Sequence, residues 1–292
     1  MIKSIGIVAT TGKPQVLELS QRLIELAQPH GIKVLLQEDC AIALGRKDLA
    51  GTLEKELATC DVLITLGGDG RVLQAARVAA PLGKPVLSVD LGTLGFLAAV
   101  KPEDIDAAFE DLRQEKYFIV ERLMLQAEVL RQDKVIFSGL LGLNDAVVAK
   151  SALARILRLS ITVHDDLVAQ TRADGLVIST PTGSTAYALS AGGPIVHPDV
   201  PLFLLCPICA HSLTQRPFAV SSNEVIEVRT EWEGDEVAEG ELEVMLTIDG
   251  QVGVPLRMGD VVRVQKSPHR ARLMRFDEES FYARLRMKMG WQ

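Results

Sequence analysis

Apolar runs and helix-like segments alternate through the first 115 residues, and this alternation constrains the fold more than any other feature of the chain. The apolar runs have the length of buried strands and are residues 4–10, 32–37, 61–66 and 84–90. The segments that we expect to be helices are 14–28, 48–60, 71–80 and 102–114. Strands that are apolar throughout and separated by helices form parallel sheets with helices on both faces. The sequence therefore predicts an N-terminal doubly wound parallel α/β domain over residues 1–115.

From about residue 116 the pattern changes to the period of two that is typical of half-buried strands. Between residues 157 and 164 apolar side chains at odd positions alternate with polar ones at even positions. Asp249 and Gly250 form a turn dipeptide of the kind found in β-hairpins. We expect a β-rich, mostly antiparallel C-terminal domain over residues 116–292, with a basic amphipathic tail at 281–291 that packs back on the N-terminal domain or on another subunit.

Composition excludes several classes of protein. The chain has 292 residues, 48% of them hydrophobic, which is enough for two domains with proper cores. Its net charge is −7 without a basic block, so we expect no nucleic-acid partner, because phosphate backbones are bound by clustered Lys and Arg. No apolar stretch is long enough to span a membrane, and the N-terminal apolar run is too short for a signal peptide. We therefore expect a cytoplasmic protein with reduced thiols and no membrane contact.

Cys206, Cys209 and His211 raise the question of a zinc site. No second pair of residues has the spacing of zinc ligands, and Pro207 lies between the two cysteines on an apparent apolar strand. We interpret both cysteines as buried thiols and expect no metal ligands among them.

The stretch TLGGDG at residues 65–70 follows a predicted strand and precedes a predicted helix. Ligands of such units lie at the carboxyl end of the strand, and the start of the helix favours an anion such as a phosphate. A lone GGDG is equally compatible with a plain tight turn. It matches neither the P-loop nor the G-x-G-x-x-G pattern. A carboxylate such as Asp69 beside a phosphate site suits phosphoryl transfer to a hydroxyl, whose proton the acid accepts.

A second loop, within residues 173–194, is rich in hydroxyl groups. It begins as a strand, breaks at Thr180 to Thr185 and resumes as a helix-like segment that ends at Gly192 and Gly193. Hydroxyl-rich turns are common, so this loop alone does not decide between a turn and a binding site. Two such loops, one from each half of the chain, suggest a ligand site in a cleft between two domains.

Together these motifs resemble the NAD kinase family over almost the whole chain. The resemblance rests on GGDG at 67–70, LGFL at 94–97, Asn144 with Asp145, the signature from Asp174 to Pro194, and the segment 207–217. It implies an N-terminal α/β domain and a C-terminal β-sandwich-like domain. It also implies transfer of a phosphoryl group from ATP, with a divalent cation such as Mg²⁺ held mainly through the nucleotide phosphates, to the 2′-hydroxyl of the adenosine ribose of NAD. The partners would be these nucleotides, and the assembly a homodimer or homotetramer.

The resemblance also implies roles for individual residues. Asp69 would be the catalytic base, Asn144 and Asp145 would bind the ribose and adenine region, and Asp174 would lie near the nicotinamide half. The remaining residues at ligand-contacting positions are Gly70, Arg155, Arg172, Thr185, Ala186, Tyr187, Ala188, Leu189, Ser190 and Gln251.

Four positions depart from the common pattern of the family. Arg71 stands where Thr is frequent, Gln74 where many relatives have a basic residue, Asp90 in place of Asn, and Ala210 in place of Pro. The first two leave open which phosphate donor is used, and Asp90 could simply accept a backbone hydrogen bond. Two alternatives also stay open: a lipid or sugar kinase with the same GGDG chemistry, and a non-catalytic sensor that binds NADP(H). Assays with a panel of substrates distinguish a lipid or sugar kinase from an NAD kinase. Turnover by the parent protein distinguishes an enzyme from a non-catalytic sensor.

Overall fold

The computed structural model describes residues 2–92, 95–150, 156–212, 214–231, 244–276 and 280–291. The chain folds into two compact units, one of Met1–Arg122 with His269–Gln292 and the other of Leu123–Pro268. Two long strands, β6 (Phe118–Arg131) and β17 (Val261–Arg275), carry the chain from one unit to the other. Among the described residues, no helix combines the length and the apolarity that crossing a membrane requires.

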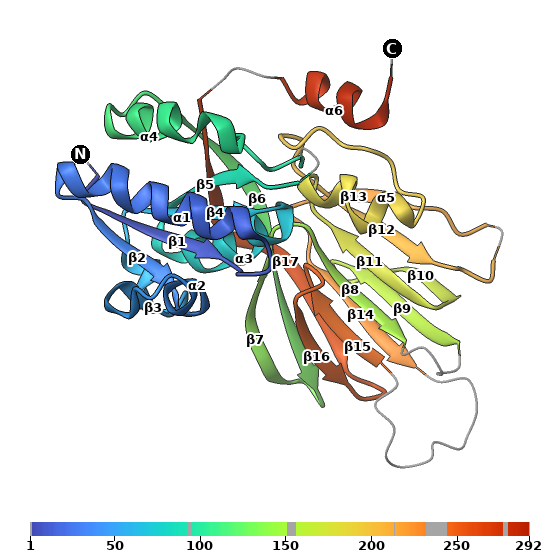
Figure 1. Ribbon diagram of the computed structural model, residues 1–292. Helices are drawn as coiled ribbons and strands as arrows, with labels where there is room; N and C mark the ends of the chain where they lie inside the picture. The colour runs from blue at the N-terminus through green and yellow to red at the C-terminus, as the bar shows by residue number, and fades with distance from the viewer. Residues whose placement is uncertain are drawn as a thin grey trace. The chain divides into compact units, whose positions relative to one another are not determined.

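The first unit contains a parallel sheet in the order β17-β5-β4-β1-β2-β3 (Figure 1). Its other strands are β1 (Ser4–Ala9), β2 (Lys33–Gln37), β3 (Ala50–Gly51), β4 (Val62–Gly67) and β5 (Pro85–Asp90). The helices of this unit are α1 (Pro14–Ala27), α2 (Glu38–Ala43), α3 (Asp69–Ala79), α4 (Ile105–Arg113) and α6 (Phe281–Met289).

Helices cover both faces of this sheet. The chain steps from β1 through α1 to β2 in one direction, and from β4 through α3 to β5 in the other. Because crossovers between parallel strands are right-handed, the two helices lie on opposite faces. Buried residues of α1 and α4 share one apolar core with the strands, whereas α3 packs on β4 and β5 with side chains outside that core. The prediction of a parallel sheet with helices on both faces is confirmed.

The predicted helix at 48–60 is wrong. Residues 50–51 form the short strand β3 beside β2, and only two 3-10 turns, Lys47–Leu49 and Leu57–Thr59, flank it. Thr52 donates hydrogen bonds to the Glu56 carboxylate from its N–H and its hydroxyl, both at 2.8 Å, which fixes a turn. A Cβ at Gly51 would lie 2.9 Å from the Glu56 Cβ, so this tight turn also requires the glycine.

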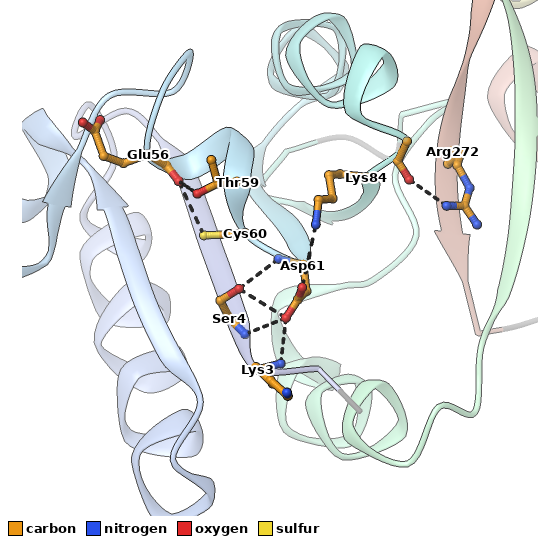
Figure 2. Close-up of polar contacts among 9 residues, drawn as sticks. Lys3, Ser4, Glu56, Thr59, Cys60, Asp61, Lys84 and Arg272 are labelled. Carbon is orange, nitrogen blue, oxygen red and sulfur yellow. Dashed lines mark hydrogen bonds and ion pairs between the residues drawn. The ribbon is translucent and has the colours of Figure 1, made fainter.

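Asp61 holds the amino ends of β1 and β4 together (Figure 2). Its Oδ2 accepts hydrogen bonds from the N–H groups of Lys3 at 2.8 Å and Ser4 at 3.0 Å, and from the Ser4 hydroxyl at 3.2 Å. Its own N–H donates to the Ser4 hydroxyl at 3.0 Å, and the Lys84 ammonium lies 3.7 Å from its Oδ1. These contacts align β1 with β4 at their amino ends, whereas the GGDG loop lies at the carboxyl end of β4.

The second unit is a pair of antiparallel sheets that share one apolar core, as the β-sandwich expectation predicts. One sheet has the order β13-β12-β11-β8-β15-β16, and the other contains β10-β9-β14-β17 with the hairpin β6-β7. The strands introduced here are β7 (Lys134–Gly142), β8 (Asp145–Lys150), β9 (Leu157–Val163), β10 (Asp166–Ala173), β11 (Gly175–Ser179), β12 (Leu202–Ile208), β13 (Phe218–Ser221), β14 (Ile226–Glu231), β15 (Val244–Ile248) and β16 (Val252–Leu256).

Local patterns in this unit agree with the sequence. In β9 the side chains of Leu157, Leu159 and Ile161 are buried in the shared core, which confirms the period of two. Asp249 and Gly250 have φ of +52° and +63° and join β15 to β16, so the predicted hairpin turn is confirmed. One interpretation needs correction: Cys206 is buried, but Cys209 is exposed, because β12 ends at Ile208 and the backbone turns there.

Candidate functional site

The carboxyl ends of β1 and β4 form the switch point of the parallel sheet, since the chain leaves these neighbouring strands in opposite directions. Open α/β sheets bind ligands at such points. The segment 10–13 follows β1 and the GGDG segment follows β4. Gly67 has a φ of +155°, and a Cβ there would lie 2.9 Å from the Arg71 Cγ, so this position requires glycine. In the structure α3 begins at Asp69, two residues before the predicted helix start at residue 71, so Asp69 lies in the first turn of the helix.

The Asp69 carboxylate is held by backbone donors. Its Oδ2 accepts a hydrogen bond from the Phe96 N–H at 2.9 Å, and its Oδ1 accepts one from the Leu97 N–H at 3.1 Å. A Cβ at Gly95 would lie 2.6 Å from the Asp69 Cγ, so the glycine of the LGFL segment leaves room for the carboxylate. Leu94 of that segment lies outside the described residues. The GGDG and LGFL motifs therefore contact each other directly, although they are separate in the sequence.

Asp90 fixes the start of the same loop. Its carboxylate is buried and accepts hydrogen bonds from the N–H groups of Gly92 at 2.9 Å and Gly95 at 2.7 Å. The interpretation of Asp90 as an acceptor of backbone hydrogen bonds is confirmed. The loop after β5 is thus held at one end by Asp90 and near its middle by Asp69.

Two cationic side chains lie at the ends of the same strands. Arg71 donates to the Gln74 Oε1 at 2.7 Å and to the Thr10 hydroxyl at 3.0 Å, so its guanidinium links the segment after β4 to the segment after β1. The Lys13 ammonium donates to the Leu91 carbonyl at 2.8 Å. Cations of this kind can offset the charge of a bound phosphate. The two residues that depart from the family pattern at 71 and 74 are thus hydrogen-bonded to each other.

In the second unit, Asn144 and Asp145 stand at the start of β8 and are organised by Asp249. The Asp249 carboxylate accepts hydrogen bonds from the N–H groups of Leu143 at 3.0 Å, Asn144 at 2.8 Å and Asp145 at 3.1 Å. The sequence indicates only a turn at Asp249, and its dipeptide carries no signal for this second role. Burial, and secondarily the neighbouring charge of Asp249, raise the pKa of Asp145 to about 7.

The hydroxyl-rich loop joins this group. The Asn144 carbonyl accepts hydrogen bonds from the Thr180 N–H at 2.8 Å and the Ser179 hydroxyl at 3.2 Å. A Cβ at Gly183 would lie 2.6 Å from the Asn144 carbonyl carbon, which explains the glycine of this signature. The Thr182 Oγ1 is buried and has no hydrogen-bond partner among the described atoms.

The run from Thr185 to Ser190 divides into buried and accessible side chains. Ala188 is fully buried in a small cluster with Val147, Val177, Leu204 and Cys206, so its side chain is not available to a ligand. Tyr187 is exposed, and it begins the short helix α5 (Tyr187–Ser190) after the 3-10 turn Thr182–Thr185. The packing of α5 against the six-stranded sheet is what places the rest of the run.

Other residues of the expected set lie elsewhere in this unit. Gln251 is in the same hairpin turn as Asp249, and its N–H donates to the Ile248 carbonyl. Asp174 forms an ion pair with Lys150 at 3.1 Å. In the register of β8 and β11, Asp145 pairs with Ser179 and Ala149 with Gly175. Asp174, one residue beyond Gly175, and Asp145 therefore lie at opposite ends of these strands, about 17 Å apart at the usual rise per residue.

The two arginines of the expected set are less informative. Arg172 is exposed near the end of β10, and its carbonyl accepts a hydrogen bond from the His211 N–H at 2.8 Å. Arg155 lies outside the described residues.

An aspartate held at the switch point of an α/β sheet, beside cations that can offset phosphate charge, is the arrangement expected of a nucleotide phosphotransferase. Comparison with known proteins narrows this class. Residues 5–117 match the ATP-NAD kinase N-terminal domain, and residues 143–276 match the ATP-NAD kinase C-terminal domain. The chain therefore belongs to the ATP-NAD kinase family.

Individual relatives are similar over the full length. A protein of Moorella thermoacetica named NAD kinase is 41% identical, over 99% of this chain and 89% of its own. One of Symbiobacterium thermophilum with the same name is 40% identical, over 98% of each chain. Among solved structures, yeast NADH kinase in complex with NADH superposes with a TM-score of 0.85 at 25% identity, covering 100% of this chain and 88% of that one.

Proposed function

We propose that this chain transfers the γ-phosphoryl group of ATP to the 2′-hydroxyl of the adenosine ribose of NAD, giving NADP and ADP. The observation that carries this proposal is the Asp69 carboxylate, held by the Phe96 and Leu97 N–H groups at the carboxyl end of β4. Family membership supports the substrates, and the geometry of Asp69 supports its role as the base.

In this reaction the ribose oxygen forms a bond to the γ-phosphorus while the bond to the oxygen that bridges the β and γ phosphates breaks. The hydroxyl proton passes to the Asp69 carboxylate. A ribose hydroxyl is a weak nucleophile at neutral pH, and a positioned general base contributes on the order of 10² to 10⁴ in rate. Backbone N–H donors fix the direction of the carboxylate, which is the part of this contribution that depends on geometry.

The second unit has the groups that a dinucleotide requires. Asn144, Asp145 and the hydroxyl-rich loop form one bonded cluster, and the unpartnered Thr182 hydroxyl lies in that loop. Asp174 lies at the far end of the same strands. We infer that the adenosine half of NAD binds at the Asn144 end and the nicotinamide half toward Asp174, as the family resemblance implies for these positions.

A divalent cation fits these residues if the nucleotide phosphates hold most of its coordination sphere. The described residues include no group of three or more His, Cys, Asp or Glu side chains that could hold a metal ion. Mg²⁺ commonly uses one or two carboxylates together with substrate phosphates and water. Asp69 and Asp90 are the carboxylates through which the chain would contact it, and each retains acceptor capacity beyond its two N–H bonds. When bound, the cation would neutralise charge on the transferring phosphate.

The test is NADP formation by the purified protein with NAD, ATP and Mg²⁺, detected with an NADP-specific dehydrogenase. NADH and other phosphate donors are assayed in parallel, since Arg71 and Gln74 alter the donor side. We expect turnover with at least one nicotinamide dinucleotide. Absence of turnover with NAD and NADH from every donor, with binding of NADP(H) retained, would overturn the proposal in favour of a sensor. Phosphorylation of a lipid or sugar alone would favour the other alternative.

A homodimer or homotetramer is also part of the proposal. Its support is the exposure of Val135, Ile136 and Phe137 on β7, a strand that pairs only with β6 among the described strands. An unpaired edge strand can pair with another chain, and an exposed apolar patch marks an interaction site. Light scattering coupled to size-exclusion chromatography measures the assembly, and a monomer at micromolar concentration would contradict it.

A further inference from the structure

The loop that holds Asp69 is itself held by the C-terminal segment. The Phe96 carbonyl accepts hydrogen bonds from Arg284 Nη1 at 3.1 Å and from Arg275 Nη2 at 3.3 Å. The Ala98 carbonyl accepts a second hydrogen bond from Arg284 Nη1, at 2.7 Å, and one from Arg275 Nη1. Arg275 ends β17 and Arg284 lies on α6, so residues that end the chain contact a loop some 180 positions earlier.

These arginines connect to Asp69 through a single peptide group. The Phe96 carbonyl and the Leu97 N–H belong to the same peptide unit. Its oxygen accepts from the two guanidinium groups, and its N–H donates to the Asp69 Oδ1 at 3.1 Å. Hydrogen bonds in such a chain polarise and orient one another. The plane of this peptide, and with it the direction of the carboxylate, is therefore set from the C-terminal side.

The contact is buried and reinforced. Arg275 is 8% exposed and Arg284 is 5% exposed, which is unusual for charged side chains. The Lys288 ammonium lies 5.7 Å from the centroid of the Phe96 ring, within the range of a cation–π contact. The Ser280 hydroxyl caps α6 by accepting a hydrogen bond from the Ala283 N–H at 3.1 Å, and Gly290 ends the helix at a φ of +66°. The helix is thus built as a defined element rather than a loose tail.

We propose that Arg284, with Arg275, is a positioning residue for phosphoryl transfer, acting on Asp69 through the Phe96–Leu97 peptide. The inference rests on the proposed role of Asp69 as the base. A merely structural role for α6 predicts that its loss lowers stability without changing the turnover of folded protein. A positioning role predicts a loss of kcat that depends on Asp69.

The main variant is Arg284→Met, which keeps the length of the side chain and removes its donors. We expect kcat to fall by about tenfold with a KM for NAD within about threefold of the parent, because displacement of a catalytic group lowers rate before binding. Arg284→Lys should recover most of kcat, since an ammonium can donate to both carbonyls. Arg286→Met on the exposed side of the same helix is the matched control and should resemble the parent.

The decisive readout is the double variant. In the Asp69→Asn background, Arg284→Met should change the residual kcat by less than about twofold, because the group it positions no longer accepts a proton. A loss of about tenfold in both backgrounds, or a parent-like kcat in folded Arg284→Met, would overturn the inference. A parent-like kcat in Asp69→Asn alone would instead overturn the assignment of the base, so the two failures are distinct.

A second variant covers the case in which Arg284→Met does not fold. Lys288→Met removes only the partly exposed cation over the Phe96 ring. It should lower kcat by about threefold at an unchanged melting temperature, in line with the modest strength of such contacts. A parent-like kcat for Lys288→Met would then count against the inference.

Discussion

Two aspartates flank strand β4, and both are held by a pair of backbone N–H groups. Asp61 precedes the strand and accepts from Lys3 and Ser4, whereas Asp69 follows it and accepts from Phe96 and Leu97. The donors of Asp61 lie at the start of the neighbouring strand β1, and Lys84 adds a positive charge beside the carboxylate. The donors of Asp69 lie on a loop that two buried arginines hold.

The comparison indicates that the same hydrogen-bonding pattern has different roles at the amino ends and at the carboxyl ends of the parallel strands. At the amino ends of the strands, the hydrogen bonds of Asp61 align β1 with β4. The pKa of the Asp61 carboxyl is lowered, chiefly by the hydrogen bond from the Lys3 N–H. At the carboxyl edge loops leave the sheet in opposite directions, so a carboxylate there can meet a ligand. Position in the topology, rather than the local contact, separates the structural aspartate from the proposed catalytic one.

The strongest test of this separation is Asp69→Asn. We expect kcat to fall by about 10² to 10⁴, because the amide cannot accept the hydroxyl proton. The free energy of unfolding should fall by only about 1 to 2 kcal/mol, because the amide oxygen can still accept one of the two N–H bonds while the other N–H loses its acceptor. Steady-state kinetics and urea unfolding of the same preparation measure both quantities. If Asp69→Asn loses stability and keeps its turnover, Asp69 has a structural role like that of Asp61.

A third aspartate sharpens the comparison, because Asp145 is buried beside Asp249 and its pKa is raised to about 7. The unfolded carboxyl ionises near pH 4, so the folded state binds the extra proton between about pH 4 and 7. Stability should therefore fall as pH rises through this window, by no more than about 4 kcal/mol. Asp145→Asn should remove this slope in urea unfolding measured from pH 4 to 8. An unchanged slope would contradict the raised pKa.

Gly95→Ala tests the room that the loop leaves for the Asp69 carboxylate. The new Cβ would lie 2.6 Å from the Asp69 Cγ, so the carboxylate must shift. We expect kcat to fall by about tenfold with a smaller change in KM for NAD. Gly253→Ala at an exposed position of strand β16 is the control, because its new Cβ would meet only the flexible end of Met245. Equal turnover in Gly95→Ala and the parent would show that the carboxylate tolerates displacement.

Asp61→Asn is expected to have the smallest effect. The carboxylate is partly exposed, so its loss should lower the free energy of unfolding by about 1 kcal/mol at pH 7 and leave kcat unchanged. Because the folded pKa of Asp61 is lowered, its stabilisation is present above about pH 4 and is lost as pH falls through the folded pKa. The difference between parent and variant should therefore shrink in acid. A loss of turnover in Asp61→Asn would contradict the assignment of a purely structural role to Asp61.

Much of the architecture was predictable from the sequence because it is encoded locally. Periods of hydrophobicity identified the strands β1, β2, β4 and β5, and the helix α1, to within one or two residues. The dipeptide Asp249-Gly250 indicated its hairpin turn. Local reasoning failed at 48–60, where the close packing of Gly51 against Glu56 overrides a weak helical pattern. The position of Asp69 at the end of a strand also followed from the sequence, together with the resemblance that its motifs carry.

The alternation of elements, the change to period two and the place of GGDG at a strand end are encoded locally, since each depends on residues a few positions apart. The contacts that hold these groups depend instead on residues far apart in the chain. Phe96 donates to Asp69 across 27 positions, Asp249 accepts from Asp145 across 104, and Arg284 reaches the Phe96 carbonyl across 188. No periodic pattern connects such residues, because contacts at these separations arise only when the packing of the core brings distant backbone together.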